Sequence, residues 1–264
     1  MSMQAGDFAY IGVGKVHLKR KCANEPMLHI GNVSALSFGV SEDVKEQKDY
    51  TAPGGGTTAE SRRITAVEVS MTLLDLDKDN IARAFLGSAS NVPVLTVTNE
   101  PHLAFLGGLI PTDHPIDETE TVTVKIGATT IAAEGNYTVS SGGITIDPDA
   151  EDITDEDNIT ISYTNLEYGN VEGITQTAQE YELFFEGLNE AKSGSPVNVR
   201  AYKVKFGPTT ALNLINDDFA SFEVKGKLLR DNCKKGKDIS KYFKVQIVKP
   251  STVDCCDEDN QSGE

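Results

Sequence analysis

The chain has no tryptophan and only four cysteines among its 264 residues. Cys22, Cys233, Cys255 and Cys256 are too few for a disulfide framework, and they lack the paired C-x-x-C spacing of a zinc site. The absence of tryptophan removes the commonest stacking platform of carbohydrate-binding modules. We therefore expect free thiols and no metal site.

Long apolar runs and a surplus of basic residues are also missing. No apolar run approaches the roughly 18–20 residues of a membrane-spanning helix, so we expect no membrane association. Residues 1–21 lack the uninterrupted apolar stretch of a secretory signal. Lys and Arg number 24 against 40 Asp and Glu, a net charge of −16, which argues against a protein built around a basic nucleic-acid patch.

Motifs that carry catalysis are missing as well. Gly12 and Gly14 are not followed by the strand-to-helix turn and third glycine of a dinucleotide fingerprint. No serine lies in a G-x-S-x-G motif, and Cys22 has no obvious partner base. The acidic stretch 147–157 lacks the sixth-position glycine of an EF-hand loop. We expect no catalytic residues, no cofactor and no enzymatic activity.

The negative charge is concentrated in two segments. Residues 99–158 contain thirteen acidic residues and one basic residue, and residues 250–264 contain five acidic residues and no basic one. The remainder of the chain has a net charge of +1. A nearly neutral body can approach copies of itself without strong repulsion, while the acidic segments maintain solubility. This distribution favours a self-assembling subunit.

Two stretches, 34–50 and 63–74, alternate apolar and polar side chains with a period of two. They are predicted to form one long hairpin (34–74) around a mobile glycine-rich loop at 51–62. The apolar side chains are expected to be buried: Leu36, Phe38, Val40, Val44, Val67, Val69 and Met71. The opposite, polar face carries Ser37, Ser41, Asp43, Gln47, Glu68, Ser70 and Thr72.

A change of period predicts one short helix over 77–87, with Asp77 as the N-cap and Gly87 as the terminating residue. Short apolar runs at turn-like spacing predict a small β-rich module after this helix. The strands of the body then resume at 181–186, 197–206, 219–229 and 242–248. The predicted organisation is a core in two parts, 1–98 and 169–249, an acidic insertion at 99–168 and a disordered acidic tail at 250–264.

Two passages together resemble the major tail tube proteins of long, noncontractile-tailed bacteriophages. In residues 29–87, a polar–apolar strand that ends in acidic residues is followed by a glycine-rich loop, a second strand and a D-x-x-N-x-x-x-A-x-x-G helix. Asp77, Asn80, Ala84 and Gly87 match this last motif. Residues 181–231 contain F-x-G-x-N (Phe185, Gly187 and Asn189), a strand that ends in Gly-Pro, and a D-D-F-x-x-F-x-V-x-G-K-x-L strand. The order and spacing of these motifs, over about half of the chain, carry the resemblance.

The resemblance implies a mainly β fold: a tail-tube-type β-sandwich or barrel with one short flanking α-helix and an inserted small β-rich domain. Type VI secretion tube rings share this fold. It also implies a structural virion protein, assembled in the bacterial host cytoplasm, whose hexameric rings stack into the tail tube for DNA ejection. The implied partners are further copies of the chain, a tape measure protein inside, terminator and tip proteins at the ends, and double-stranded DNA that passes without specific binding.

In such a tube, the polar face of the hairpin is expected to line a water-filled bore. A bore of Ser, Thr and acidic residues without a basic stripe lets DNA slide, because binding strength rises with the number of phosphates neutralised. The glycine-rich loop is expected to contact the next ring through these residues: Tyr50, Pro53, Gly54, Gly55, Gly56 and Arg62.

Two alternatives stay open from the sequence. The first is an adhesion or binding β-sandwich on a virion or cell surface, which would recognise its partner through the acidic insertion. The second is a tail terminator or decoration protein of the same kind of virion.

Overall fold

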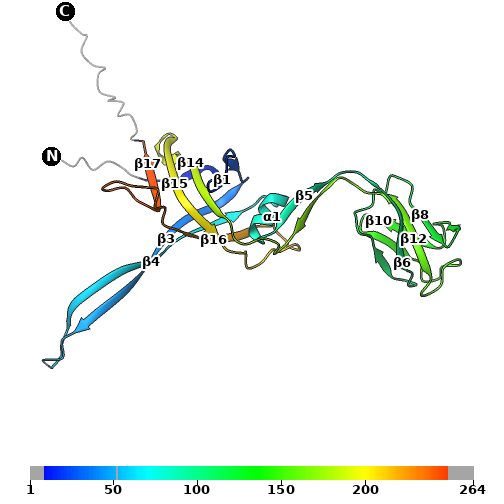
Figure 1. Cartoon of the computed structure of the whole chain (residues 1–264), viewed down its shortest axis with the longest axis horizontal. Coiled ribbons are helices and arrows are strands. Elements are labelled where there is room, and N and C mark those ends of the chain that lie inside the picture. The colour runs from blue at the N-terminus through cyan, green and yellow to red at the C-terminus, as the bar shows by residue number, and fades with distance from the viewer. Residues whose placement is uncertain (1–8, 52, 249–264) are drawn as a thin grey trace, which may run out of the picture. The chain divides into compact units, whose positions relative to one another are not determined.

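The computed structural model describes residues 9–51 and 53–248. The expected disordered tail at 250–264, including Cys255 and Cys256, lies outside the described residues. Within them the fold is mainly β, with strands β1 to β17, one α-helix and one 3₁₀ turn (Figure 1). No helix in this part of the chain is long and apolar enough to cross a membrane.

The chain divides into two compact units. The first comprises the chain up to Ser88 and from Glu172 onward, and the second is Ala89–Val171. The insertion was expected at 99–168, so the second unit is somewhat longer than the acidic segment at both ends. It contains fourteen acidic residues and one basic residue.

The first unit is built on an eight-stranded sheet with the order β2-β1-β14-β15-β16-β4-β3 and with β17 beside β15. All of its strand pairs are antiparallel. β14 occupies one edge of β15, while β16 and β17 pair with successive parts of the other edge. The strands are β1 Gly12–Arg20, β2 Leu28–His29, β3 Val33–Lys48, β4 Thr57–Leu73, β14 Glu180–Asn189, β15 Ser195–Phe206, β16 Phe222–Leu228 and β17 Phe243–Ile247.

The sheet curls, so that strands from both of its ends share one hydrophobic core. Leu183 of β14 and Met71 of β4 are both buried in this core. The ring of Phe38 on β3 stacks on that of Phe243 on β17, with centroids 5.5 Å apart and an interplanar angle of 21°. The described strands nevertheless form an open path, because β3 and β17 are not hydrogen-bonded to each other. The mainly β fold is confirmed, and no sheet closes into a barrel among the described residues.

The single helix, α1 (Lys78–Ala84), packs on this sheet through the residues of the D-x-x-N motif. The Nδ2 of buried Asn80 donates to the Ile30 carbonyl at 2.8 Å, and its Oδ1 accepts from Arg83 at 2.7 Å. Ala84 is 1% exposed and belongs to the core. Asp77 occupies the N-cap position as expected, although its side chain makes no capping hydrogen bond.

Gly87 has a different role from the expected helix stop. The left-handed residue at the end of α1 is Leu86, with φ 50°. At Gly87, a Cβ atom would lie 2.3 Å from the Glu172 carbonyl oxygen. Glycine is needed here because another backbone segment approaches closely.

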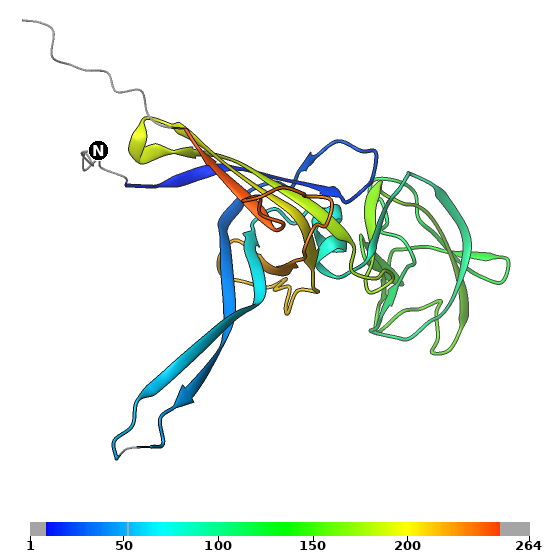
Figure 2. The same ribbon diagram turned by 60° about the vertical axis from the view of Figure 1, so that its left-hand side comes forward.

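β3 and β4 extend as a two-stranded arm beyond the core (Figures 1 and 2). We define the arm as residues 39–48 of β3 and 57–65 of β4, all of which are exposed. The connecting loop is shorter than predicted, because β4 begins at Thr57. The amide of Asp49 donates to the Gly56 carbonyl at 2.8 Å and closes the loop.

The expected burial of the apolar hairpin residues is confirmed only near the core. Val67, Val69 and Met71 are 5% exposed or less. Leu36 and Phe38 are half-buried. The prediction is wrong for Val40 and Val44, which are 58% and 41% exposed. Alternation shows that one face of a strand is apolar, but it does not show whether the same chain covers that face.

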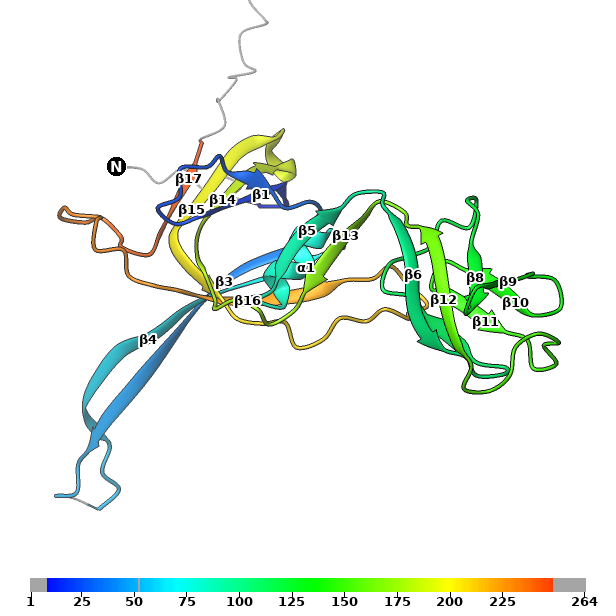
Figure 3. The same cartoon turned by 45° about the vertical axis from the view of Figure 1, so that its right-hand side comes forward.

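The second unit has its own core between two small sheets, with the orders β6-β12-β8-β9 and β10-β11-β7 (Figure 3). Its largest fully buried side chains include Ile116, Ile144, Ile161 and Tyr163. β5 and β13 pair as a two-stranded ribbon where the chain enters and leaves this unit. The strands are β5 Ser88–Val92, β6 Thr96–Leu103, β7 Leu109–Pro111, β8 Thr123–Ile126, β9 Thr129–Ile131, β10 Tyr137–Ser140, β11 Gly143–Ile146, β12 Asn158–Thr164 and β13 Tyr168–Glu172.

Candidate functional site

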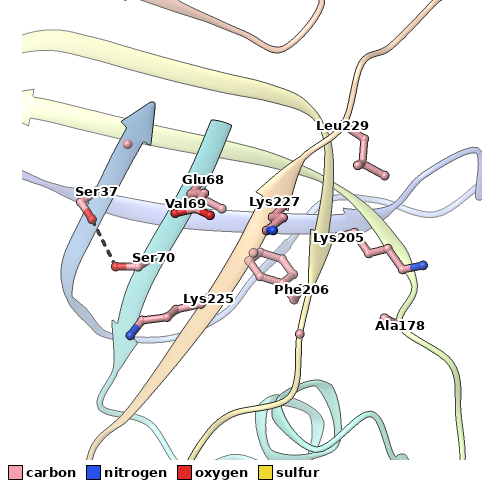
Figure 4. Close-up of a pocket in the computed structure, with 13 residues that line it drawn as sticks. Ser37, Glu68, Val69, Ser70, Ala178, Lys205, Phe206, Lys225, Lys227 and Leu229 are labelled. Carbon is pink, nitrogen blue, oxygen red and sulfur yellow. Dashed lines mark hydrogen bonds between the residues drawn. The ribbon is translucent and has the colours of Figure 1, made fainter. Parts of the chain in front are cut away.

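An open groove of about 750 Å³ lies on the face of the curled sheet that points away from the core (Figure 4). On β16, buried core residues alternate with exposed residues, and two of the exposed ones, Lys225 and Lys227, line the groove. The lining residues include Ser37, Gly39, Glu68, Ser70, Lys205, Gly207, Lys225, Lys227 and Leu229.

Strand register brings these residues together, because directly opposite residues of an antiparallel pair lie on the same face. Ser37 is opposite Ser70, and their hydroxyl oxygens are 3.2 Å apart. Ser70 is in turn opposite Lys225. The next row across the sheet runs from Gly39 through Glu68 and Lys227 to Lys205.

The groove contains more basic side chains than the hairpin sequence suggests. Lys225 forms an ion pair with Glu223 at 2.9 Å. The side chains of Lys205 and Lys227 make no ion pair or hydrogen bond within the described part of the chain. The expectation of a polar face without a basic stripe is therefore wrong for this region. The lysines come from β15 and β16, whose pairing beside the hairpin was not predicted.

The other predicted bore residues lie outside the groove. Ser41, Asp43 and Gln47 continue along β3 into the arm and are exposed. A β-bulge interrupts the register next to Ser41, because Thr65 is an extra residue on β4. Thr72 is half-buried near the core end of β4. The structure thus brings together only Ser37, Glu68 and Ser70 from the predicted set.

The predicted inter-ring residues lie mainly at the tip of the arm. Tyr50 is 88% exposed, and Pro53, Gly54, Gly55 and Gly56 belong to the connecting loop. Gly54 has φ +83°, which favours glycine. Arg62 was predicted to be a loop residue, but it is part of β4. It lies opposite Val44, and its guanidinium contacts Glu42 at 3.1 Å and also Glu60.

A buried carboxylate in the second unit was missed by the sequence analysis. Glu100 is 8% exposed and accepts hydrogen bonds from the Tyr163 hydroxyl at 2.6 Å and the Asp113 amide at 3.0 Å. His102 Nε2 lies 2.6 Å from the same carboxylate. Burial and the bond to Glu100 raise the pKa of Tyr163 to about 12.

Burial alone would raise the pKa of Glu100, but its hydrogen bonds outweigh burial and hold this pKa below its ordinary value. The carboxylate is thus satisfied from several directions, which indicates a structural role. Glu100 and Tyr163 are far apart in the sequence, and no motif marks the pair. Within the described residues, no group of three or more His, Cys, Asp or Glu side chains could hold a metal ion.

Comparison with known families finds one family model that matches nearly all of the described residues. The sequence model described as "Protein of unknown function UCP028589" matches residues 9–246. The chain belongs to this family. The match covers the arm, the groove and most of both compact units, so the second unit belongs to the family match together with the first. A search of curated proteins found no match.

Proposed function

We propose that this family member is a structural subunit whose rings stack into a virion tail tube that conducts DNA. The resemblance to tail tube proteins implies six copies in each ring. The observation that carries the proposal is the arm, a long two-stranded ribbon that is exposed on both faces. An isolated two-stranded ribbon is at best marginally stable in water, so an arm of this length is explained if another copy covers it.

The arm also presents apolar side chains that no other part of the described chain covers. Val40, Val44 and Ile64 are 58%, 41% and 61% exposed. The register places them on the side of the ribbon that continues from the core-facing side of β3. Glu42 and Arg62 lie on the same side and pair with each other at 3.1 Å. Exposed apolar side chains beside paired charges on a projecting element are typical of an interaction surface.

Sheet edges give a second reason for assembly. The outer edge of β3 has no strand partner among the described residues. A long unpaired edge is a template for pairing with another chain, and natural proteins cover or pair such edges. Head-to-tail contacts between different surfaces of identical copies close into rings when the rotation allows it.

In this proposal the groove face, with Ser37, Ser70 and the three lysines, lines the bore. The protein has no catalytic role and needs no cofactor. Its partners are neighbouring copies, a tape measure protein inside the tube, terminator and tip proteins at the ends, and the double-stranded DNA that passes through. The corresponding location is the virion tail.

The proposal is tested by removing the arm. Residues 42–65 are replaced by Asn-Gly, which connects the paired residues Ser41 and Ala66 through a two-residue hairpin turn. We expect the intact protein to sediment as rings or larger species, and the variant as a monomer with an unchanged circular dichroism spectrum. Equal assembly of the variant would show that the arm is not the contact. If the intact protein stays a compact monomer at all concentrations, the proposed function is overturned.

A further inference from the structure

Basic side chains outnumber acidic ones in the groove, on a protein that is strongly negative. Lys205, Lys225 and Lys227 line it together with one carboxylate, that of Glu68, and only one of the lysines has an ion-pair partner in the described residues. The chain as a whole carries a charge of −16, and residues 250–264 contain five acidic residues and no basic one. We propose that the acidic segment 254–259 docks in this groove of its own chain.

The spacing of the groove lysines matches the spacing of carboxylates in the acidic segment. Lys225 and Lys227 are two residues apart on β16, so their Cα atoms are about 6.8 Å apart along the strand. Lys205 lies directly opposite Lys227 on β15. Asp257 and Asp259 are also two residues apart, so an extended chain presents them at the same spacing. Two carboxylates can therefore face two ammonium groups without distortion of either strand.

The segment is long enough to reach the groove. The described chain ends beside the start of β15, where the Val248 amide donates to the Pro196 carbonyl at 3.0 Å and Ile247 is opposite Val197. From Val197 to Lys205 the strand covers about 26 Å. The ten residues from Ile247 to Asp257 span up to about 33–36 Å when extended.

Two other occupants are less well matched. A nucleic acid is repelled by the charge of −16, although three lysines could bind its phosphates. Binding of the acidic second unit of another copy costs the translational and rotational entropy of association. A tethered segment instead has an effective concentration on the order of millimolar, so weak ion pairs suffice to hold it. The inference concerns a single chain and does not rest on ring assembly.

Carbodiimide cross-linking at low salt tests the contact, because it joins a carboxylate to an amine only where they touch. Dilute protein, mixed from equal parts of ¹⁴N- and ¹⁵N-labelled chains, is cross-linked and digested. The ion pairs Lys225–Glu223 at 2.9 Å and Lys203–Glu180 at 2.8 Å are internal positive controls.

We expect links from Lys205, Lys225 or Lys227 to residues 254–259, in peptide pairs of a single isotope. The absence of such links beside successful controls would overturn the proposal. Links in which mixed-isotope pairs are as frequent as single-isotope pairs, as random pairing of the two labels gives, would assign the groove to a second copy.

Acylation rates of individual lysines provide an independent measurement. In the variant D257N/E258Q/D259N, the three groove lysines should be acylated roughly 3- to 10-fold faster, as expected if the segment covers them for about 70–90% of the time. The exposed reference residues Lys15 and Lys45 should not change. High salt should produce the same acceleration in the natural chain.

The matched control variant E118Q/E120Q/E151Q removes the same charge from exposed positions of the second unit and should leave the groove lysines unchanged. Equal acylation in the natural chain and the segment variant would contradict docking. If a 20-nucleotide single-stranded DNA protects the lysines equally in both, the groove binds nucleic acid instead.

Discussion

The double substitution V40S/I64S should weaken assembly while leaving the subunit folded. Both side chains lie on the arm, 58% and 61% exposed, and neither belongs to the core. Complete burial of a side chain of this size stabilises by about 1.5–3 kcal/mol. Scaled by the exposed fractions, the two side chains together contribute about 2–3.5 kcal/mol to a contact that covers them. The apparent association constant should fall roughly 30- to 400-fold.

Sedimentation velocity over a concentration series measures this shift directly. The control V94S/I174S removes comparable exposed apolar side chains outside the arm, at 58% and 84% exposure. It should assemble like the natural chain, and the urea unfolding curves of both variants should match that of the natural chain. If V40S/I64S assembles as well as the control, the exposed apolar side chains of the arm do not form an interface.

Three further predictions concern the stability of the units, each followed by thermal or urea unfolding. Gly187→Ala should destabilise the first unit by about 1–3 kcal/mol, because its Cβ would overlap the neighbouring Phe185 ring and a β15 carbonyl; an unchanged midpoint would refute this packing. Hydrogen bonds outweigh burial and lower the pKa of Glu100 in the folded protein. The ionised carboxylate therefore stabilises the fold fully above the ordinary carboxyl pKa, and this contribution is lost as pH falls through the lowered pKa. Glu100→Gln should reduce this loss in acid, and an unchanged pH profile would contradict the assignment. Lys21→Met should lower the free energy of unfolding by about 3 kcal/mol, because the carboxylate of Asp231, which is 4% exposed, loses its partner at 2.8 Å. The double variant Lys21→Met/Asp231→Leu should recover most of this loss, because it leaves no unpaired buried charge.

The sequence predicts the strands well where one face is covered by the same chain. The alternation of Val67, Val69 and Met71 predicts the core end of β4, and the change of period after Leu74 predicts α1. The same alternation at Val40 and Val44 continues along β3 into the arm, where the described chain provides no cover. Local pattern depends on the residue sequence alone, whereas burial depends on what packs against the strand.

The groove could not be predicted because it depends on long-range register. Ser37 and Ser70 belong to one predicted hairpin, and their pairing follows from it. Lys205 and Lys227 join them only because β16 pairs with both β4 and β15, which no local pattern specifies. The Glu100–Tyr163 hydrogen bond is a similar case, since pairing between β6 and β12 brings the two residues together.

Electron microscopy of the purified protein at high concentration tests the central proposal most directly. The account predicts rings or tubes with a central hole. In a reconstruction, Ser37, Ser70 and Lys227 should face the hole, and the arm should lie against an adjacent copy. Single compact particles at every concentration, or rings in which the groove faces outward, would contradict it.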